Sequence, residues 1–176
     1  MPLYGYGVKA YILSVLETAI RITDGKVPAS ILEKILILGK EQLSKPVELL
    51  DGVEDTLNAL VGRYRLIVVT KGDLLDQEQK LRRSGIEHLF HHIEVMSDKT
   101  DREYRALLNH LDIRPDEFLM IGNSVRSDIL PPLNLGSYAV HVPYHTTWAH
   151  ERVDEPVINL HFFMVESLWE VISLLP

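Results

Sequence analysis

The sequence contains no cysteine and no long apolar run, and its charge is one-sided. Without cysteine, a disulfide framework and a thiolate metal site are both excluded. No apolar stretch approaches the roughly 18 residues of a membrane span, and the first residues lack the basic-then-apolar layout of a signal peptide. The 25 acidic and 18 basic residues give a net charge of -7, which disfavours a nucleic-acid or anionic-lipid surface. We therefore expect a cytoplasmic protein that binds neither nucleic acid nor membrane; its oligomeric state is left open.

The sequence has the composition of an ordinary globular domain. Its 176 residues, 46% hydrophobic and 24% charged, are enough to bury a substantial core. Apolar residues recur at helical spacing from Val8 to Ile20 and again from Ile31 to Leu43, with a turn at Asp24-Gly25. Two helices in this order predict an αα-hairpin over residues 1–46.

From residue 47 onward, helical and strand patterns alternate. The predicted strands cover 66–69, 93–96, 118–121 and 138–142. The predicted helices cover 53–63, 75–83, a segment to 111 opened by a Thr100–Glu103 capping box, a short turn after Ser124 limited by Pro131-Pro132, and 164–175. This alternation predicts an α/β fold: a three-layer, Rossmann-like, mainly parallel sheet with helices on both faces.

Polar residues follow the predicted strands, where ligands bind in folds of this kind. Thr70-Lys71-Gly72 offers a hydroxyl and a glycine turn whose amides suit an anion, and Lys99 offers an ammonium group. Asn123 and Asp128 offer the hard oxygen ligands that Mg²⁺ prefers. Together they predict a phosphate-plus-magnesium site.

Each of these residues also has an ordinary structural interpretation. Thr70 is equally typical of a strand terminus, and Lys99 of a solvated surface lysine. Asp128 fits the first turn of a helix, and Asn123 fits a turn. Their placement at successive strand ends favours a common site.

The order of these segments resembles the haloacid dehalogenase-like (HAD) hydrolase superfamily. Residues 66–72 resemble its motif II, residues 97–99 its motif III, and residues 120–128 its motif IV. The resemblance covers about residues 47–145, and the αα-hairpin resembles part of a helical cap. It implies that Thr70 binds the transferring phosphoryl group, that Lys99 neutralises the nucleophile and the phosphate, and that Asp128 helps to hold Mg²⁺.

The sequence departs from the family pattern in two places. Asn123 stands where the family's phosphatases usually have aspartate. Motif I, an apolar strand ending in Asp-x-Asp that supplies the nucleophile, is not found in residues 1–46. We therefore expect residues 1–46 to be a cap remnant and residues 47–176 a core lacking its first strand. That strand would lie between those ending at Thr70 and Gly122, so the chain is interpreted as truncated at its N-terminus.

Three functions are compatible with this pattern. The first is a Mg²⁺-dependent phosphatase acting on a small phosphorylated metabolite when full length, with the present chain inactive or nearly so for want of the nucleophile. The second is a non-catalytic module that binds a phosphorylated ligand or protein partner. The third is a metal-independent haloacid dehalogenase-type hydrolase, since such members of the family can carry asparagine near position 123. Whether this chain is an enzyme is left open.

Overall fold

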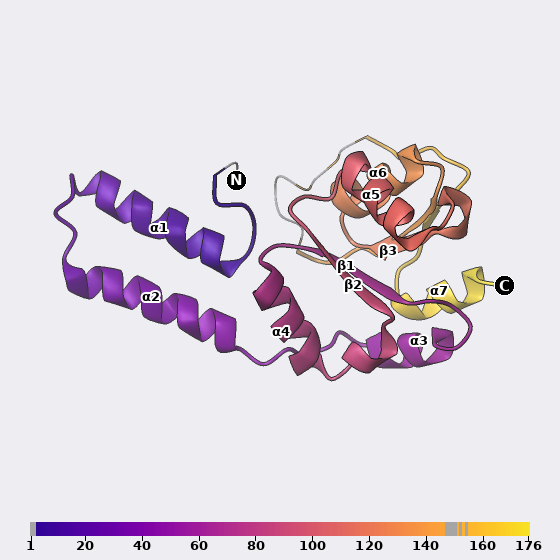
Figure 1. The fold of residues 1–176 in the computed structure, drawn as a ribbon, viewed down its shortest axis with the longest axis horizontal. Helices are drawn as coiled ribbons and strands as arrows, with labels where there is room; N and C mark the ends of the chain where they lie inside the picture. The colour runs from indigo at the N-terminus through magenta and orange to yellow at the C-terminus, as the bar shows by residue number, and fades with distance from the viewer. Residues whose placement is uncertain (1–2, 147–150, 152, 154) are drawn as a thin grey trace. The chain divides into compact units, whose positions relative to one another are not determined.

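The computed structural model describes residues 3–146, 151, 153 and 155–176 (Figure 1). The chain divides into two compact units, each built from two segments. The first unit holds Met1–Glu48 and Val68–Ser97, and the second holds Leu49–Ile67 and Asp98–Pro176. Each unit contains its own small sheet, and the predicted α/β fold class is confirmed. In the described part of the chain, no helix combines the length and apolarity needed to cross a membrane.

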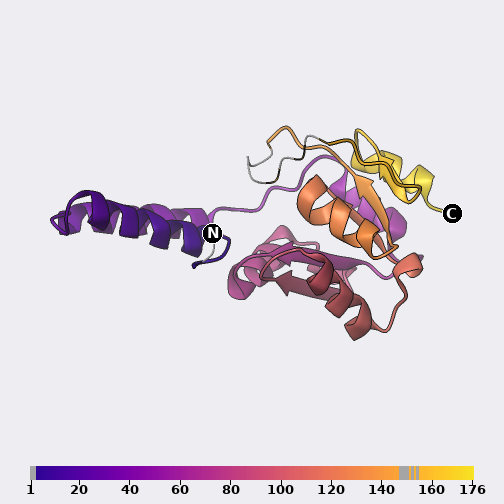
Figure 2. The ribbon, with the colours of Figure 1, turned by 90° about the horizontal axis from the view of Figure 1, so that it is seen from above.

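The predicted αα-hairpin forms the beginning of the first unit. Helices α1 (Val8–Ile22) and α2 (Ala29–Ser44) lie alongside each other in both views (Figures 1 and 2). They approach closely at Gly39, where a methyl group would lie 2.7 Å from Ile12 Cγ1. Both helices also expose large apolar side chains, so neither buries its whole apolar surface within the described residues. The exposed ones are Tyr11, Leu13, Ile20, Ile22, Ile31, Leu36, Ile37 and Leu38.

A two-stranded sheet completes the first unit. Strand β1 (Ile67–Lys71) pairs with β2 (His92–Met96), and α4 (Leu74–Ser84) and the short turn η1 (Glu87–Leu89) connect them. Helix α4 packs against β2. The first strand runs two residues beyond the predicted 66–69, because the turn that ends it starts only at Gly72.

The N-terminus of α4 is capped by Asp73. Its Oδ1 accepts a hydrogen bond from the Asp76 amide at 3.0 Å and lies 2.7 Å from Lys9 Nζ. The hydrogen bond from Lys9, followed by the one from the Asp76 amide, holds the pKa of Asp73 below its ordinary value. A carboxyl group whose pKa is lower in the folded chain makes its full contribution to the stability of the fold at pH values above its unfolded pKa of about 4. That contribution is lost as the pH falls through the lower folded pKa.

We therefore expect Asp73→Ala to lower the free energy of unfolding by about 1 kcal/mol at pH 7. Urea denaturation of both proteins should show this difference shrinking as the pH is lowered from 7 toward about 3. Asp73→Asn keeps a capping oxygen without the charge, so its loss at pH 7 should be smaller. An Asp73→Ala deficit that stays the same across this pH range would contradict the assignment.

The second unit is built around a parallel sheet in the order β3-β4-β5. The register pairs Gly122 with His141 and Val140 with Phe163. Its elements are α3 (Val53–Leu60), α5 (Asp101–Leu111), η2 (Pro115–Glu117), β3 (Leu119–Gly122), the π-helical turn η3 (Val125–Ile129), α6 (Leu130–Asn134), β4 (Tyr138–His141), β5 (Phe162–Met164) and α7 (Leu168–Leu174).

Helices cover both faces of this sheet, as a layered α/β fold requires. Ala139 and Val140 are neighbours in β4 and therefore point to opposite faces. Ala139 packs with Ile129 and Leu133 from the η3–α6 segment, whereas Val140 packs with Val165, just after β5, and with Val171 in α7. The two central residues of β4 are thus buried, one on each face of the sheet.

Two predicted helices near the sheet are corrected by the structure. The helix predicted over 164–175 is present as α7, but it begins only at Leu168 after a Ser167–Glu170 capping box, and Met164 belongs to the short strand β5. The apolar run that ends at Met164 pairs with β4 instead, because the edge of β4 needs backbone partners. Pro131-Pro132 does not end the preceding turn but lies in the first turn of α6, where the missing N–H groups are not needed.

Two helix ends also differ from expectation. The predicted capping box at Thr100 does not form, because the Thr100 hydroxyl donates to the Glu103 carboxylate rather than accepting from the backbone. The helix predicted over 53–63 ends at Leu60, since Val61 has an extended ψ and Gly62 adopts a left-handed conformation with φ +83°.

Candidate functional site

A buried ion pair joins two of the predicted site residues in the second unit. Lys99 Nζ lies 2.6 Å from Asp128 Oδ1, and the two side chains are only 10% and 7% exposed. Lys99 lies just before α5, and Asp128 belongs to η3 after strand β3. The structure therefore brings together two charges that are 29 residues apart in the sequence.

The backbone after β3 fixes the Asp128 carboxylate. Its Oδ2 accepts a hydrogen bond from the Ser124 amide at 3.0 Å. Ser124 Oγ in turn accepts from the Ser127 amide at 3.0 Å, which caps the start of η3. The carboxylate lies directly over Gly122, where a methyl group would be 2.4 Å from Asp128 Oδ2. Only glycine leaves room for this carboxylate, so the position of Asp128 depends on a glycine at position 122.

Tyr104 supports the same turn from α5. Its side chain is fully buried, and its hydroxyl donates to the Ser127 carbonyl oxygen at 3.1 Å. Burial raises the pKa of the Tyr104 hydroxyl far above its ordinary value, and the negative charge of Asp128 adds to the effect. Tyr104 therefore stays protonated and acts as a hydrogen-bond donor to the turn that carries Asp128.

Asn123 lies between Gly122 and Ser124, on the exposed side of the turn. Its carbonyl oxygen is 3.1 Å from His141 Nε2, which donates a hydrogen bond in the tautomer that carries the proton on that nitrogen. This contact joins the carboxyl ends of β3 and β4, which are paired at Gly122 and His141. The Asn123 side chain thus lies one residue from the strand end and faces outward.

The oxygen atoms present do not by themselves compose a magnesium site. Asp128 uses Oδ1 for Lys99 and Oδ2 for the Ser124 amide. Among the described residues, no group of three or more histidine and acidic side chains is arranged to hold a metal ion. Mg²⁺ takes octahedral oxygen coordination and is normally held by one or two carboxylates that are free to ligate it. The metal role of Asn123 and Asp128 remains a prediction.

The remaining predicted site residues lie in the first unit, at the end of β1. The Thr70 hydroxyl donates to Gln77 Oε1 at 2.9 Å, and the Gly72 amide donates to the Met96 carbonyl oxygen at 3.3 Å. Lys71 Nζ lies 4.5 Å from the centre of the Tyr6 ring, a cation–π contact. The Thr70 hydroxyl and the Gly72 amide thus both donate hydrogen bonds to groups of their own unit. Their role toward a phosphate remains a prediction.

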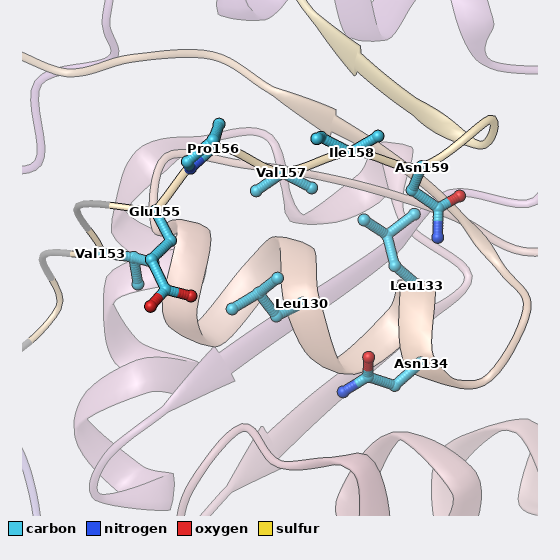
Figure 3. Close-up of a pocket in the computed structure, with 9 residues that line it drawn as sticks. All are labelled: Leu130, Leu133, Asn134, Val153, Glu155, Pro156, Val157, Ile158 and Asn159. Carbon is cyan, nitrogen blue, oxygen red and sulfur yellow. The ribbon is translucent and has the colours of Figure 1, made fainter.

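A shallow pocket of about 200 Å³ lies elsewhere in the second unit (Figure 3). It is bounded on one side by α6 and on the other by the chain segment that leads to β5. Among the described residues that line it, six are apolar and none is lysine or arginine. The lining residues are Leu130, Leu133, Asn134, Val153, Glu155, Pro156, Val157, Ile158 and Asn159.

Sequence patterns did not indicate three residues that hold the Asp128 turn. Tyr104 was expected only as an apolar position of a helix, and its buried hydroxyl contact depends on tertiary structure. Ser124 falls within the motif-IV segment but carried no assigned role. Glu151 lies in a segment without any periodic pattern, yet its carboxylate accepts hydrogen bonds from the Ser124 and Ser127 hydroxyls. No local sequence signal connects residues this far apart.

Comparison with known proteins shows the family of this chain. The family model of the haloacid dehalogenase-like hydrolases matches residues 4–136. A crystal structure of a haloacid dehalogenase-like family hydrolase from Xanthomonas campestris is 35% identical, with a TM-score of 0.85 over 98% of this chain and 69% of that chain. The chain belongs to the haloacid dehalogenase-like hydrolase family.

Two curated relatives are named as phosphatases. The N-acylneuraminate-9-phosphatase of Mus musculus is 26% identical over 167 residues, which cover 90% of this chain and 65% of that protein. The glyceraldehyde 3-phosphate phosphatase of Methanothermobacter thermautotrophicus is 34% identical over 92 residues, which cover 49% of this chain and 40% of that protein. The matched regions thus span between two fifths and about two thirds of these relatives.

Proposed function

We propose that this chain carries the phosphate-binding half of a phosphatase that acts on a small phosphate monoester. The observation that carries the proposal is the buried pair of Lys99 and Asp128, 2.6 Å apart at the end of the parallel sheet. Two curated relatives act, by name, on phosphorylated small molecules, which supports this substrate class.

Lys99 can donate hydrogen bonds to a phosphate while it remains paired with Asp128. A lysine ammonium has three donor hydrogens, and the contact with Asp128 uses one of them. The same pairing removes much of the conformational freedom of the lysine, so the ammonium is held in place before a ligand arrives. Within the first unit, we separately propose Thr70, Lys71 and Gly72 as phosphate donors, since they carry a hydroxyl, an ammonium and an amide group.

Turnover needs a group that the sequence does not contain. The 176 residues hold no Asp-x-Asp sequence, and the family route forms its intermediate on the first aspartate of that motif. The same motif would add carboxylate oxygens for Mg²⁺, which Asn123 and the already engaged Asp128 do not replace. We therefore propose that the present chain binds phosphate, turns over esters little or not at all, and binds Mg²⁺ weakly.

A second candidate is a non-catalytic module that binds a phosphorylated ligand or protein. The lack of an Asp-x-Asp sequence and the outward-facing Asn123 favour it. The third candidate, a metal-independent dehalogenase-type hydrolase, would also need a nucleophilic aspartate. The two leading candidates share the phosphate site and differ in whether a nucleophile makes it catalytic.

The proposal is tested by assaying the purified chain with p-nitrophenyl phosphate, with and without Mg²⁺. We expect no hydrolysis above that of a Lys99→Met control, and hydrolysis in the presence of Mg²⁺ once an apolar segment ending in Asp-x-Asp is fused ahead of Leu3. Metal-dependent turnover by the chain itself would contradict the stated need for a supplied nucleophile. If the fused protein binds phosphate but stays inactive, the non-catalytic module is favoured.

A further inference from the structure

In the connection between β4 and β5, the side chain of Glu151 contacts the turn that carries Asp128. Its Oε2 accepts a hydrogen bond from Ser127 Oγ at 2.6 Å and another from Ser124 Oγ. The two serines are 4% and 8% exposed, so both hydroxyl contacts are shielded from water. Hydrogen bonds to a charged acceptor are stronger than neutral ones, and shielding increases their strength further.

Ser124 is the residue that joins this contact to the site. Its amide donates to Asp128 Oδ2 at 3.0 Å, and its hydroxyl donates to Glu151. The same hydroxyl oxygen accepts from the Ser127 amide at 3.0 Å. A shift of the Ser124 backbone would therefore disturb its hydrogen bonds to Asp128 and to Glu151 together. The network runs without a gap from Glu151 through Ser124 to Asp128 and Lys99.

We infer that Glu151 is a positioning residue, which fixes the Ser124–Asp128 turn and thereby the place of the Asp128 carboxylate beside Lys99. Its hydrogen bonds to Ser124 and Ser127 link Glu151 to the turn that carries Asp128, so it acts on the ion pair through that turn. The inference deepens the proposed function, and it rests on that function only for the binding measurement described below.

The chemistry of the contact predicts which substitutions preserve it. Both serine hydroxyls donate to the same oxygen of Glu151. A glutamine carbonyl oxygen has two lone pairs and accepts two such bonds, so Glu151→Gln retains the geometry, whereas Glu151→Ala removes the acceptor. Glu155→Ala is the matched control, since Glu155 is an exposed acid in the same connection.

The test is amide hydrogen exchange of the full chain, with Ser124 and Ser127 as reporters and Tyr138 as reference. The Tyr138 amide donates to the Phe118 carbonyl oxygen at 3.0 Å, at the other end of the paired strands. In Glu151→Ala we expect exchange at Ser124 and Ser127 to become at least about tenfold faster, with Tyr138 unchanged. Glu151→Gln should restore most of the protection, and Glu155→Ala should match the native chain.

Two results would overturn the inference. One is equal acceleration at Ser124, Ser127 and Tyr138 in Glu151→Ala, which would show a loss of overall stability alone. The other is acceleration confined to residues 155–161. It would show that the contact of Glu151 orders the connection between β4 and β5 and does not fix the Ser124–Asp128 turn.

Phosphate binding, followed by ³¹P NMR titration of inorganic phosphate, separates this inference from the proposed function. Glu151→Ala should weaken binding about tenfold, equivalent to one hydrogen bond to a charged group, while Glu151→Gln recovers most of the affinity. If the native chain binds no phosphate but the exchange pattern holds, the proposed function fails and the positioning role stands. If the native chain binds phosphate and Glu151→Ala changes neither exchange nor affinity, the positioning role fails.

Discussion

Replacing Lys99 with alanine is expected to lower the free energy of unfolding by about 3 kcal/mol, because it leaves a buried carboxylate without its cation. Asp128 is 7% exposed and lies 2.6 Å from the ammonium of Lys99, and its remaining hydrogen bond, from Ser124, does not neutralise its charge. Urea denaturation at pH 7 measures the change.

Two variants separate the ion pair from the general cost of removing a lysine. Lys40→Ala removes an exposed lysine of α2 and should change the free energy of unfolding by less than about 0.5 kcal/mol. In Lys99→Met with Asp128→Asn, both charges are gone, so stability should exceed that of Lys99→Ala alone. A loss below about 1 kcal/mol for Lys99→Ala would show that the pair is solvated in solution, as exposed pairs are.

A second large effect is expected from a single added methyl group at Gly122. In Gly122→Ala the new Cβ would lie 2.4 Å from Asp128 Oδ2 and 2.5 Å from Asp128 Cβ and Cγ. Asp128 is buried and is held at both oxygens, so relieving this clash requires moving the carboxylate away from Lys99 and Ser124. Overpacking costs about 1–3 kcal/mol, and we expect Gly122→Ala to lose at least about 3 kcal/mol, because the ion pair is disturbed as well.

The matched control is Gly62→Ala, where φ is +83° and no atom lies within 4 Å of the added methyl group. It carries only the cost of a left-handed alanine, about 1–2 kcal/mol, whereas Gly122 does not have a positive φ and suffers only the steric clash. Thermal or urea denaturation of both variants checks the order. If Gly122→Ala is the more stable of the two, the close contact between the strand end and Asp128 is not present in solution.

The sequence predicted the elements whose pattern is local, and the failures have physical causes. The hairpin of α1 and α2 and strands β1 to β4 follow from apolar spacing, which is set by burial. Strand β5 was missed because three residues are too few to show a period, and their conformation is decided by pairing with β4. The turn η3 has π-helical hydrogen bonding, which no residue pattern specifies.

For the site, strand-end position identified Lys99 and Asp128, and the structure places them in contact. Position along the sequence did not identify what holds them, since the supporting contacts come from Tyr104 in another helix and from Glu151, 23 residues beyond Asp128. Such contacts depend on tertiary packing. A search for strand-end polar residues finds groups that can meet a ligand but not the groups that orient them.

The central claim is that Lys99, held beside Asp128, binds phosphate, and ³¹P NMR titration of inorganic phosphate tests it most directly. Lys99→Met should weaken phosphate binding at least tenfold, as expected for one lost hydrogen bond to a charged group. Lys40→Met, which changes an exposed lysine of α2, should leave binding unchanged, with circular dichroism confirming that both variants stay folded. The claim would be contradicted by a native chain that binds no phosphate, or by a folded Lys99→Met variant that binds it as tightly as the native chain.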